Sequence, residues 1–177
     1  MAAKGFIELL RLAKRSKKSH DMTKQEANRW SGIAFEMLGQ YFVAPLGEVA
    51  EVIYQPKYTY IPKSQDWVCG LANVRGRLLS VSDLPHFLTG KKSPFLPTQK
   101  VLCVNHQDHY IGLVVDRVLG IQHFNKNSFF AQSEDLDGVL KPYCPGYFKQ
   151  SQKQWQVFLL SRLLKDEQYM NASMNKM

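Results

Sequence analysis

Residues 70–84 read GLANVRGRLLSVSDL, with two apolar runs on either side of a short polar turn. Short apolar runs bounded by glycine and polar residues are typical of β-strands. The pattern predicts a strand over 68–73, a second strand over 78–81 and a hairpin between them. Gly70 and Gly76 permit the tight backbone geometry that such a hairpin needs.

Arg75, at the turn of this hairpin, carries a charge that cannot be buried alone. Its guanidinium group must either reach solvent or meet a carboxylate. The alternation over 47–54 places Glu51 with Val49 and Ile53 on one face of another predicted strand. Glu51 is therefore the expected partner of Arg75.

Many short strands of the same kind follow along the chain. Further strands or hairpins are expected over 33–46, 47–54, 100–115, 146–148 and 155–160. Residues 47–52 and 116–121 follow the two hairpins in a similar way, which indicates a loose duplication. Evenly spaced short strands predict an all-β barrel or sandwich, and two copies predict two small barrels that share a core.

Two helices are expected within or after these strands. Asp83 suits the N-cap of a helix and Pro85 suits its first turn, so a helix is predicted to begin at 82–85. Residues 161–170 predict a C-terminal helix.

The first 30 residues differ from the rest of the chain. They hold a net charge of +5 out of +8 for the whole sequence. A helix is predicted over 5–15, where apolar residues recur at helical spacing, and a short helical turn over 24–30. The apolar stripe, with its neighbouring lysines, could lie on a membrane surface, pack on the barrels or bind a partner. Its shortness favours packing or partner binding.

Composition places the chain among globular proteins. Hydrophobic residues make up 45% of the chain and charged residues 21%. No apolar run approaches the roughly 18 residues of a membrane span, and no secretory signal is recognisable. The three cysteines are widely spaced and odd in number, which favours free thiols in a reducing cytoplasm.

Catalytic motifs are hard to find in this sequence. Cys103, His106 and His109 form a Cys-x-x-His-x-x-His string that suggests a metal enzyme, but no second cluster completes a four-ligand zinc site. The stronger interpretation makes Cys103 a core residue and places the histidines beside a hairpin turn. We therefore expect no enzymatic activity, no metal site and no cofactor.

A nucleic-acid-binding module built on SH3-like barrels is the alternative function. Tyr54, Tyr58 and Tyr60 cluster beside Lys57 and Lys63, where bases could stack. Beyond residue 30 the net charge is only +3, which is low for strong phosphate binding. We therefore favour rings that cover a strand edge, and no nucleic-acid partner.

The stretch 70–84 resembles the signature of the CheW family of chemosensory coupling proteins, in which a Gly–apolar–x–Asn–apolar–Arg–Gly turn leads through a strand to Asp-Leu. Residues 43–53 and 110–121 are similar to the same family in the same order, and the resemblance covers roughly 31–165. It departs from the family at the polar Ser80 and Ser82, and again near 158–164, where the usual Asp-Leu is missing.

The resemblance implies an all-β fold of two SH3-like five-stranded β-barrel subdomains sharing a core. The domain would span 31–170, after an N-terminal helical, basic extension over 1–30 and before a C-terminal tail over 171–177. The first 30 residues and the WSGIAF stretch at 30–35 most resemble the branch of the family that serves twitching motility by type IV pili.

The resemblance also implies a function. Family members are adaptors that couple a CheA-type histidine kinase to the cytoplasmic tips of methyl-accepting chemoreceptors, so a cytoplasmic protein recruited to membrane-associated receptor arrays is expected. Contact with the membrane would be indirect, through the receptors. The partner-binding residues implied by position are Leu46, Val49, Glu51, Val52, Asn73, Arg75 and Gly76.

Overall fold

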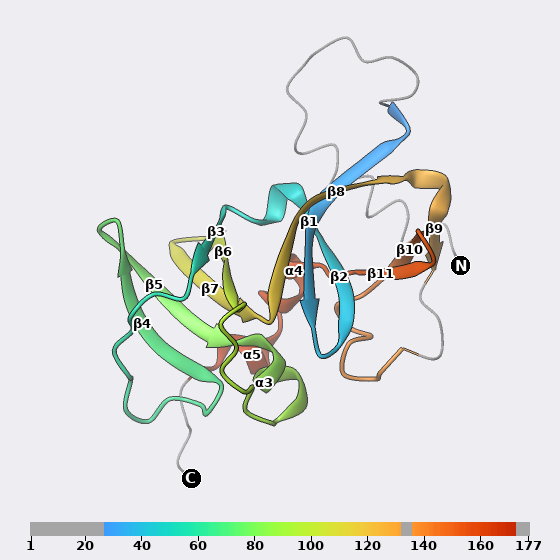
Figure 1. The fold of residues 1–177 in the computed structure, drawn as a ribbon. Coiled ribbons are helices and arrows are strands. Elements are labelled where there is room, and N and C mark those ends of the chain that lie inside the picture. The colour runs from blue at the N-terminus through green and yellow to red at the C-terminus, as the bar shows by residue number, and fades with distance from the viewer. Residues whose placement is uncertain (1–26, 132–135, 173–177) are drawn as a thin grey trace. The chain divides into compact units, whose positions relative to one another are not determined.

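The computed structural model describes residues 27–131 and 136–172 (Figure 1). The helix predicted over 5–15, most of the predicted extension over 1–30 and most of the predicted tail over 171–177 lie outside these ranges. Within the described ranges no helix is long and apolar enough to cross a membrane.

The chain divides into two compact units, and each unit takes residues from two separate parts of the sequence. Among the described residues, the first unit comprises 27–48, 119–131 and 136–160, and the second comprises 49–118 and 161–172. Each unit is built around one β-sheet.

A six-stranded sheet forms the first unit. Its strands, in spatial order, are β8 (Arg117–Asn125), β1 (Arg29–Met37), β2 (Gln40–Pro45), β11 (Lys153–Val157), β10 (Gly146–Gln150) and β9 (Phe129–Ala131). Short 3-10 helices, η1 (Leu46–Glu48) and η2 (Lys126–Ser128), follow β2 and β8. The core is largely aromatic: the rings of Phe124 and Phe148 stack with centroids 4.7 Å apart, and Trp30 packs 5.0 Å from Phe148.

A five-stranded sheet forms the second unit. Its strands, in spatial order, are β3 (Glu51–Tyr54), β6 (Lys100–His106), β7 (His109–Val115), β5 (Arg77–Asp83) and β4 (Val68–Val74). Helix α3 (Leu84–Thr89) follows β5, and two short helices, α4 (Leu160–Leu163) and α5 (Glu167–Met170), come near the end of the chain. The core is aliphatic and is built from Leu79, Val81, Val101 and Val114 together with the thiol of Cys103.

The two halves of the chain exchange one strand each. Strand β3 follows the β1–β2 hairpin in sequence but pairs with β6, and β8 follows the β6–β7 hairpin but pairs with β1. The two segments with similar sequences, 47–52 and 116–121, therefore belong to the parts of the chain that pass from one sheet to the other. The predicted all-β fold is confirmed: its two five-stranded barrel subdomains correspond to the two sheets, although the first sheet has six strands.

Most local predictions are confirmed. Strands β4 and β5 flank the predicted hairpin turn, and β6 and β7 form the predicted second hairpin. Asp83 is the N-cap of α3, where its side chain accepts a hydrogen bond of 3.0 Å from the backbone N–H of His86.

Three predicted elements differ from the observed ones. The strand predicted over 47–54 begins at Glu51, because η1 extends to Glu48 and residues 49–50 connect it to β3. The C-terminal helix predicted over 161–170 is two helices, because Asp166 caps a new helix by accepting from the N–H of Gln168 at 2.8 Å. The helical turn predicted over 24–30 is wrong for residues 29–30, because β1 begins at Arg29.

Candidate partner-binding surface

The β4–β5 hairpin, green in Figure 1, ends in a two-residue turn at Arg75 and Gly76. Both residues have positive φ angles, 50° and 80°, as the tight turns that match strand twist require. The side chain of Asn73 accepts a hydrogen bond of 2.9 Å from the N–H of Gly76. Asn73 and Gly76 therefore shape the turn, and the turn presents Arg75 at the end of the sheet.

The expected ion pair between Arg75 and Glu51 is present. The guanidinium Nη1 of Arg75 lies 2.8 Å from Oε2 of Glu51, which sits on β3 opposite Cys103. The side chain of Arg75 is 77% exposed, whereas that of Glu51 is 27% exposed. Most of the guanidinium thus remains accessible to solvent.

Tyr110 holds the other oxygen of the same carboxylate. Its hydroxyl donates a hydrogen bond to Oε1 of Glu51. The guanidinium of Arg77 lies 4.0 Å from the centroid of the Tyr110 ring and donates a 2.8 Å hydrogen bond to Oδ1 of Asn105. The result is a polar network at one end of the five-stranded sheet, built from strands β3, β5, β6 and β7 and from the hairpin turn.

Sequence reasoning did not identify Tyr110, Arg77 or Asn105 as part of this site. A usable signal existed, since a hairpin with its turn near 107–108 pairs Asn105 with Tyr110. The parallel register of β5 and β7 places Leu79 beside Tyr110. Local sequence patterns do not predict this register.

The network determines the protonation of its members. The hydrogen bond from Tyr110, followed by the charge of Arg75, holds the pKa of Glu51 below its ordinary value. Burial, followed by the hydrogen bond to Glu51, raises the pKa of Tyr110. The carboxylate is therefore charged and the phenol neutral near pH 7.

The remaining predicted residues are placed less closely together. Val49 is half-buried just before β3, and Val52 is on the opposite face of that strand from Glu51 and 37% exposed. Leu46 belongs to the first unit, within η1, and is 40% exposed. The structure thus brings together Glu51, Arg75 and the turn residues, and not all seven.

The residues of the string that suggested a metal site lie on two strands, Cys103 and His106 on β6 and His109 on β7. Cys103 is buried in the core, while His106 and His109 pair across the end of the β6–β7 hairpin. Across 27–131 and 136–172, no three His, Cys, Asp or Glu side chains are grouped so that they could hold a metal ion. The three cysteines are free thiols, and burial raises the pKa of Cys69 to about 11.

The tyrosines of the alternative nucleic-acid interpretation are exposed. Tyr54, Tyr58 and Tyr60 are 78%, 44% and 66% exposed. The ammonium of Lys100 lies 3.0 Å from the centroid of the Tyr54 ring. Thr59, between the other two tyrosines, pairs with Leu71 and so covers part of the edge of β4.

Comparison with known proteins places this geometry in a family. Residues 31–168 match the family described as CheW-like domain. The chain is 44% identical to the protein PilI of Pseudomonas aeruginosa over 151 residues, which cover 85% of this chain and 84% of that protein. It is 30% identical to the chemotaxis protein CheW of Thermotoga maritima over 95 residues, 54% of this chain and 62% of that protein.

A solved structure shows the same fold. The scaffolding protein TtCheW from Thermoanaerobacter tengcongensis aligns with a TM-score of 0.64 at 20% identity, over 73% of this chain and 88% of that one. The match over 31–168 and the 44% identity to PilI show that the chain belongs to the CheW-like family.

Proposed function

We propose that this chain is a non-catalytic adaptor that couples a CheA-type histidine kinase to methyl-accepting chemoreceptors. The pathway would be a chemotaxis-like one that controls twitching motility by type IV pili. The observation that carries the proposal is the 44% identity to PilI over 84% of that protein's length. As an adaptor the protein would act in the cytoplasm, at membrane-associated receptor arrays.

The surface around Arg75 supports this function. Adaptors bind through groups that are held in place before the partner arrives, since preorganisation lowers the entropic cost of association. Glu51 is fixed by two partners, and Arg75 is fixed at one side while 77% of its side chain is exposed. The proposed partner-binding residues are Leu46, Val49, Glu51, Val52, Asn73, Arg75 and Gly76.

An adaptor needs no reaction to transmit a signal. Holding two partners at once raises the effective concentration of each for the other. A difference in affinity between two states of one partner then changes the state of the other.

Calorimetric titration with the regulatory domain of a CheA-type kinase from the same cell tests the proposal. We expect saturable one-to-one binding by the full chain. Arg75→Ala is compared with Arg29→Ala, which removes the same charge from an exposed arginine of the first unit. A folded wild-type chain that binds neither the kinase domain nor a receptor cytoplasmic fragment would contradict the adaptor function.

The two partners are separated by repeating the titration with a receptor cytoplasmic fragment. Loss of receptor binding in Arg75→Ala, with kinase binding retained, would assign Arg75 to the receptor side. Retention of both would make Arg75 a structural residue of the turn. Steeply salt-dependent binding of oligonucleotides, weakened by Tyr54→Ala, would instead support the nucleic-acid alternative.

A further inference from the structure

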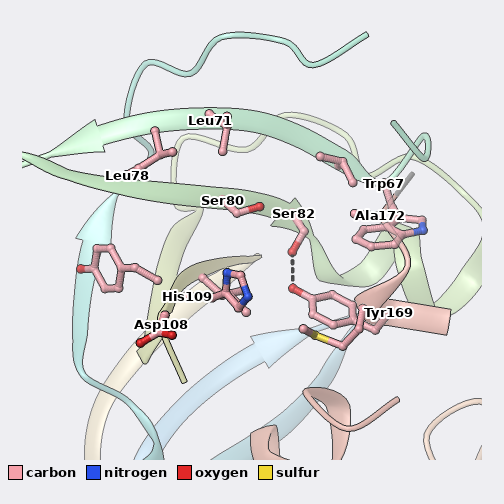
Figure 2. A pocket seen from close by; sticks show the side chains of 13 residues that line it. Trp67, Leu71, Leu78, Ser80, Ser82, Asp108, His109, Tyr169 and Ala172 are labelled. Atoms are coloured by element: carbon pink, nitrogen blue, oxygen red, sulfur yellow. Dashed lines mark hydrogen bonds between the residues drawn. The ribbon is translucent and has the colours of Figure 1, made fainter. Parts of the chain in front are cut away.

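A hollow of about 350 Å³ lies in the second unit, between the outer face of β4, β5 and β7 and the helix α5 (Figure 2). It adjoins the Glu51–Arg75 network through Tyr110, which belongs to that network and also lines the hollow, whereas Glu51 and Arg75 do not line it. Pockets at the lower end of the usual range for small ligands have about this volume.

One wall of the hollow is aromatic and rigid. The hydroxyl of Tyr169 lies 2.8 Å from the hydroxyl of Ser82, as the dashed line in Figure 2 shows. The ring of Tyr169 stacks on Trp67 with centroids 5.1 Å apart and meets the edge of Phe87 at 5.1 Å. After α5, the carbonyl of Ala172 accepts a 2.8 Å hydrogen bond from the N–H of Gln65. The hollow is therefore preformed, and a ligand would not need to order this wall.

The opposite wall is aliphatic and partly accessible to solvent, with Ile111 only 6% exposed. Leu71, Leu78 and Ile111 come from β4, β5 and β7, and Leu78 is 65% exposed. Met170, on α5, is 40% exposed at the same hollow. Covering these side chains would release water from apolar surface, which favours a ligand with an apolar body.

The polar groups at the hollow determine whether a cationic or an anionic ligand is favoured. Asp108, in the turn between β6 and β7, is the one formally charged side chain among the described residues that line it. Its carboxylate makes no hydrogen bond or ion pair with any residue in the described ranges, and the same holds for the hydroxyl of Ser80. An unpaired carboxylate beside an apolar hollow favours a cation over an anion, although the net charge of +8 on the chain opposes this local preference.

We propose that this pocket binds a small organic cation, namely a primary ammonium group on an aryl or branched alkyl body. The apolar body packs against Leu78, Ile111 and Tyr169. The ammonium group donates to the carboxylate of Asp108, and the hydroxyl of Ser80 is a second acceptor. This site does not depend on the adaptor function proposed above.

Three probes of similar shape test the site on the full-length chain: 2-phenylethylamine, its uncharged counterpart 2-phenylethanol and the anion 3-phenylpropanoate. Titration is followed by two-dimensional amide NMR. We expect saturable shifts grouped at Leu71, Leu78, Ile111 and Tyr169. The amine should bind up to about fivefold tighter than the alcohol, as for an exposed ion pair, and the anion more weakly than either.

Two variants distinguish the roles of charge and apolar surface. Asp108→Asn should abolish the preference for the amine while the alcohol still binds, whereas Asp66→Asn, at an exposed aspartate that does not line the hollow, should leave the preference unchanged. Leu78→Thr should weaken the binding of all three probes. Because Leu78 is 65% exposed, this substitution should leave the fold intact. The site is refuted if no probe shifts the pocket residues saturably, and charge selection is refuted if Asp108→Asn leaves the preference intact.

Discussion

At the scale of single residues, the Glu51 carboxylate is the best-determined feature of the candidate surface. One oxygen is held by Arg75 and the other by Tyr110. An ion pair to an arginine as exposed as Arg75 contributes little by itself. The phenol is only 5% exposed, and its ring is held in turn by Arg77, so the orientation of the carboxylate depends mainly on Tyr110.

The depressed pKa of Glu51 predicts an acid dependence of stability. A carboxyl group whose pKa is lower in the folded than in the unfolded state stabilises the fold above its unfolded pKa, about 4.3. This contribution is lost as the pH falls through the lower, folded-state pKa. We expect Tyr110→Phe to raise the pKa of Glu51, because it removes the largest cause of the shift. Carboxyl NMR titration measures the pKa directly.

Tyr54→Phe is the matched control for this prediction, since it removes a phenol hydroxyl from the same unit at a position that is 78% exposed. It should leave the Glu51 titration unchanged. An unaltered Glu51 pKa in Tyr110→Phe would show that the charges of Arg75 and Arg77, and not the phenol, lower it.

At the scale of elements, the β4–β5 hairpin depends on two glycines in different ways. Gly76 has a φ of 80° at the turn, and a Cβ placed there would meet open space. Gly70 has a φ of 145° beside the bulge in β4, and a Cβ placed there would overlap the carbonyl oxygen of Thr59. A side chain at position 76 would therefore cause backbone strain alone, whereas one at position 70 would cause backbone strain and a steric clash.

We predict that Gly76→Ala lowers the free energy of unfolding by about 1 kcal/mol, the typical cost of a left-handed conformation for a residue with a Cβ. Gly70→Ala should cost about 3 kcal/mol or more, because the Thr59–Leu71 pairing must also break. Urea unfolding measures both. Equal costs for the two variants would mean that the chain around Thr59 moves aside freely.

Helix α5 is attached to its sheet by one buried polar contact. Ser82 and Tyr169 are 3% and 4% exposed, and their hydroxyls bond to each other. The hydroxyl of Ser82 also donates to the carbonyl of Gly112 at 3.3 Å, whereas the hydroxyl of Tyr169 has no second hydrogen-bond partner within the described ranges. Removing the serine hydroxyl therefore leaves a buried phenol unsatisfied, which costs more than the reverse change.

For these two residues we predict a non-additive double-mutant cycle in urea unfolding. Ser82→Ala should cost about 2 kcal/mol and Tyr169→Phe about 1 kcal/mol, while the double variant should cost less than the sum. Ser80→Ala, on the same strand and without a hydrogen bond in the described ranges, is the control and should stay within about 0.5 kcal/mol of wild type. Additive costs would show that the hydroxyls do not interact.

At the scale of the whole molecule, the two units differ in how far apart in the sequence their strands lie. The core of the first unit combines Trp30, Ala34 and Val43 with aromatic and aliphatic residues that come after residue 118. The second unit, by contrast, has its whole five-stranded sheet between 49 and 118.

This division predicts how a truncated chain behaves. In a fragment of residues 1–118, strands β1 and β2 lack β8 and β11, so their amide NMR signals should collapse to random-coil positions. A two-stranded hairpin is at best marginally stable in water. Adding residues 119–177 in trans should restore the dispersed signals. Dispersed β1 and β2 signals from the fragment alone would contradict the expectation.

Much of the fold was predictable because its signals are local. Alternation located most strands, Asp83 and Pro85 located the start of α3, and glycines located the β4–β5 turn. The Glu51–Arg75 ion pair was predictable as well, because an arginine at a turn between apolar strands must either reach solvent or meet a carboxylate. The boundary between α4 and α5 was missed because it depends on capping by Asp166, which overrides apolar periodicity, and the short η1 was missed as well.

The sequence by itself determined the all-β class, the hairpins and the arginine–carboxylate pair, since these follow from spacing and charge within short stretches. The tertiary structure alone decided that β11 runs parallel to β2 and β5 parallel to β7, that β3 and β8 exchange sheets, and that Tyr110 meets Glu51. It also decided that Tyr169 closes one wall of the hollow beside Asp108. The physical reason is that strand alternation defines the face on which a side chain lies, whereas its neighbours depend on the register between strands that are far apart in the chain.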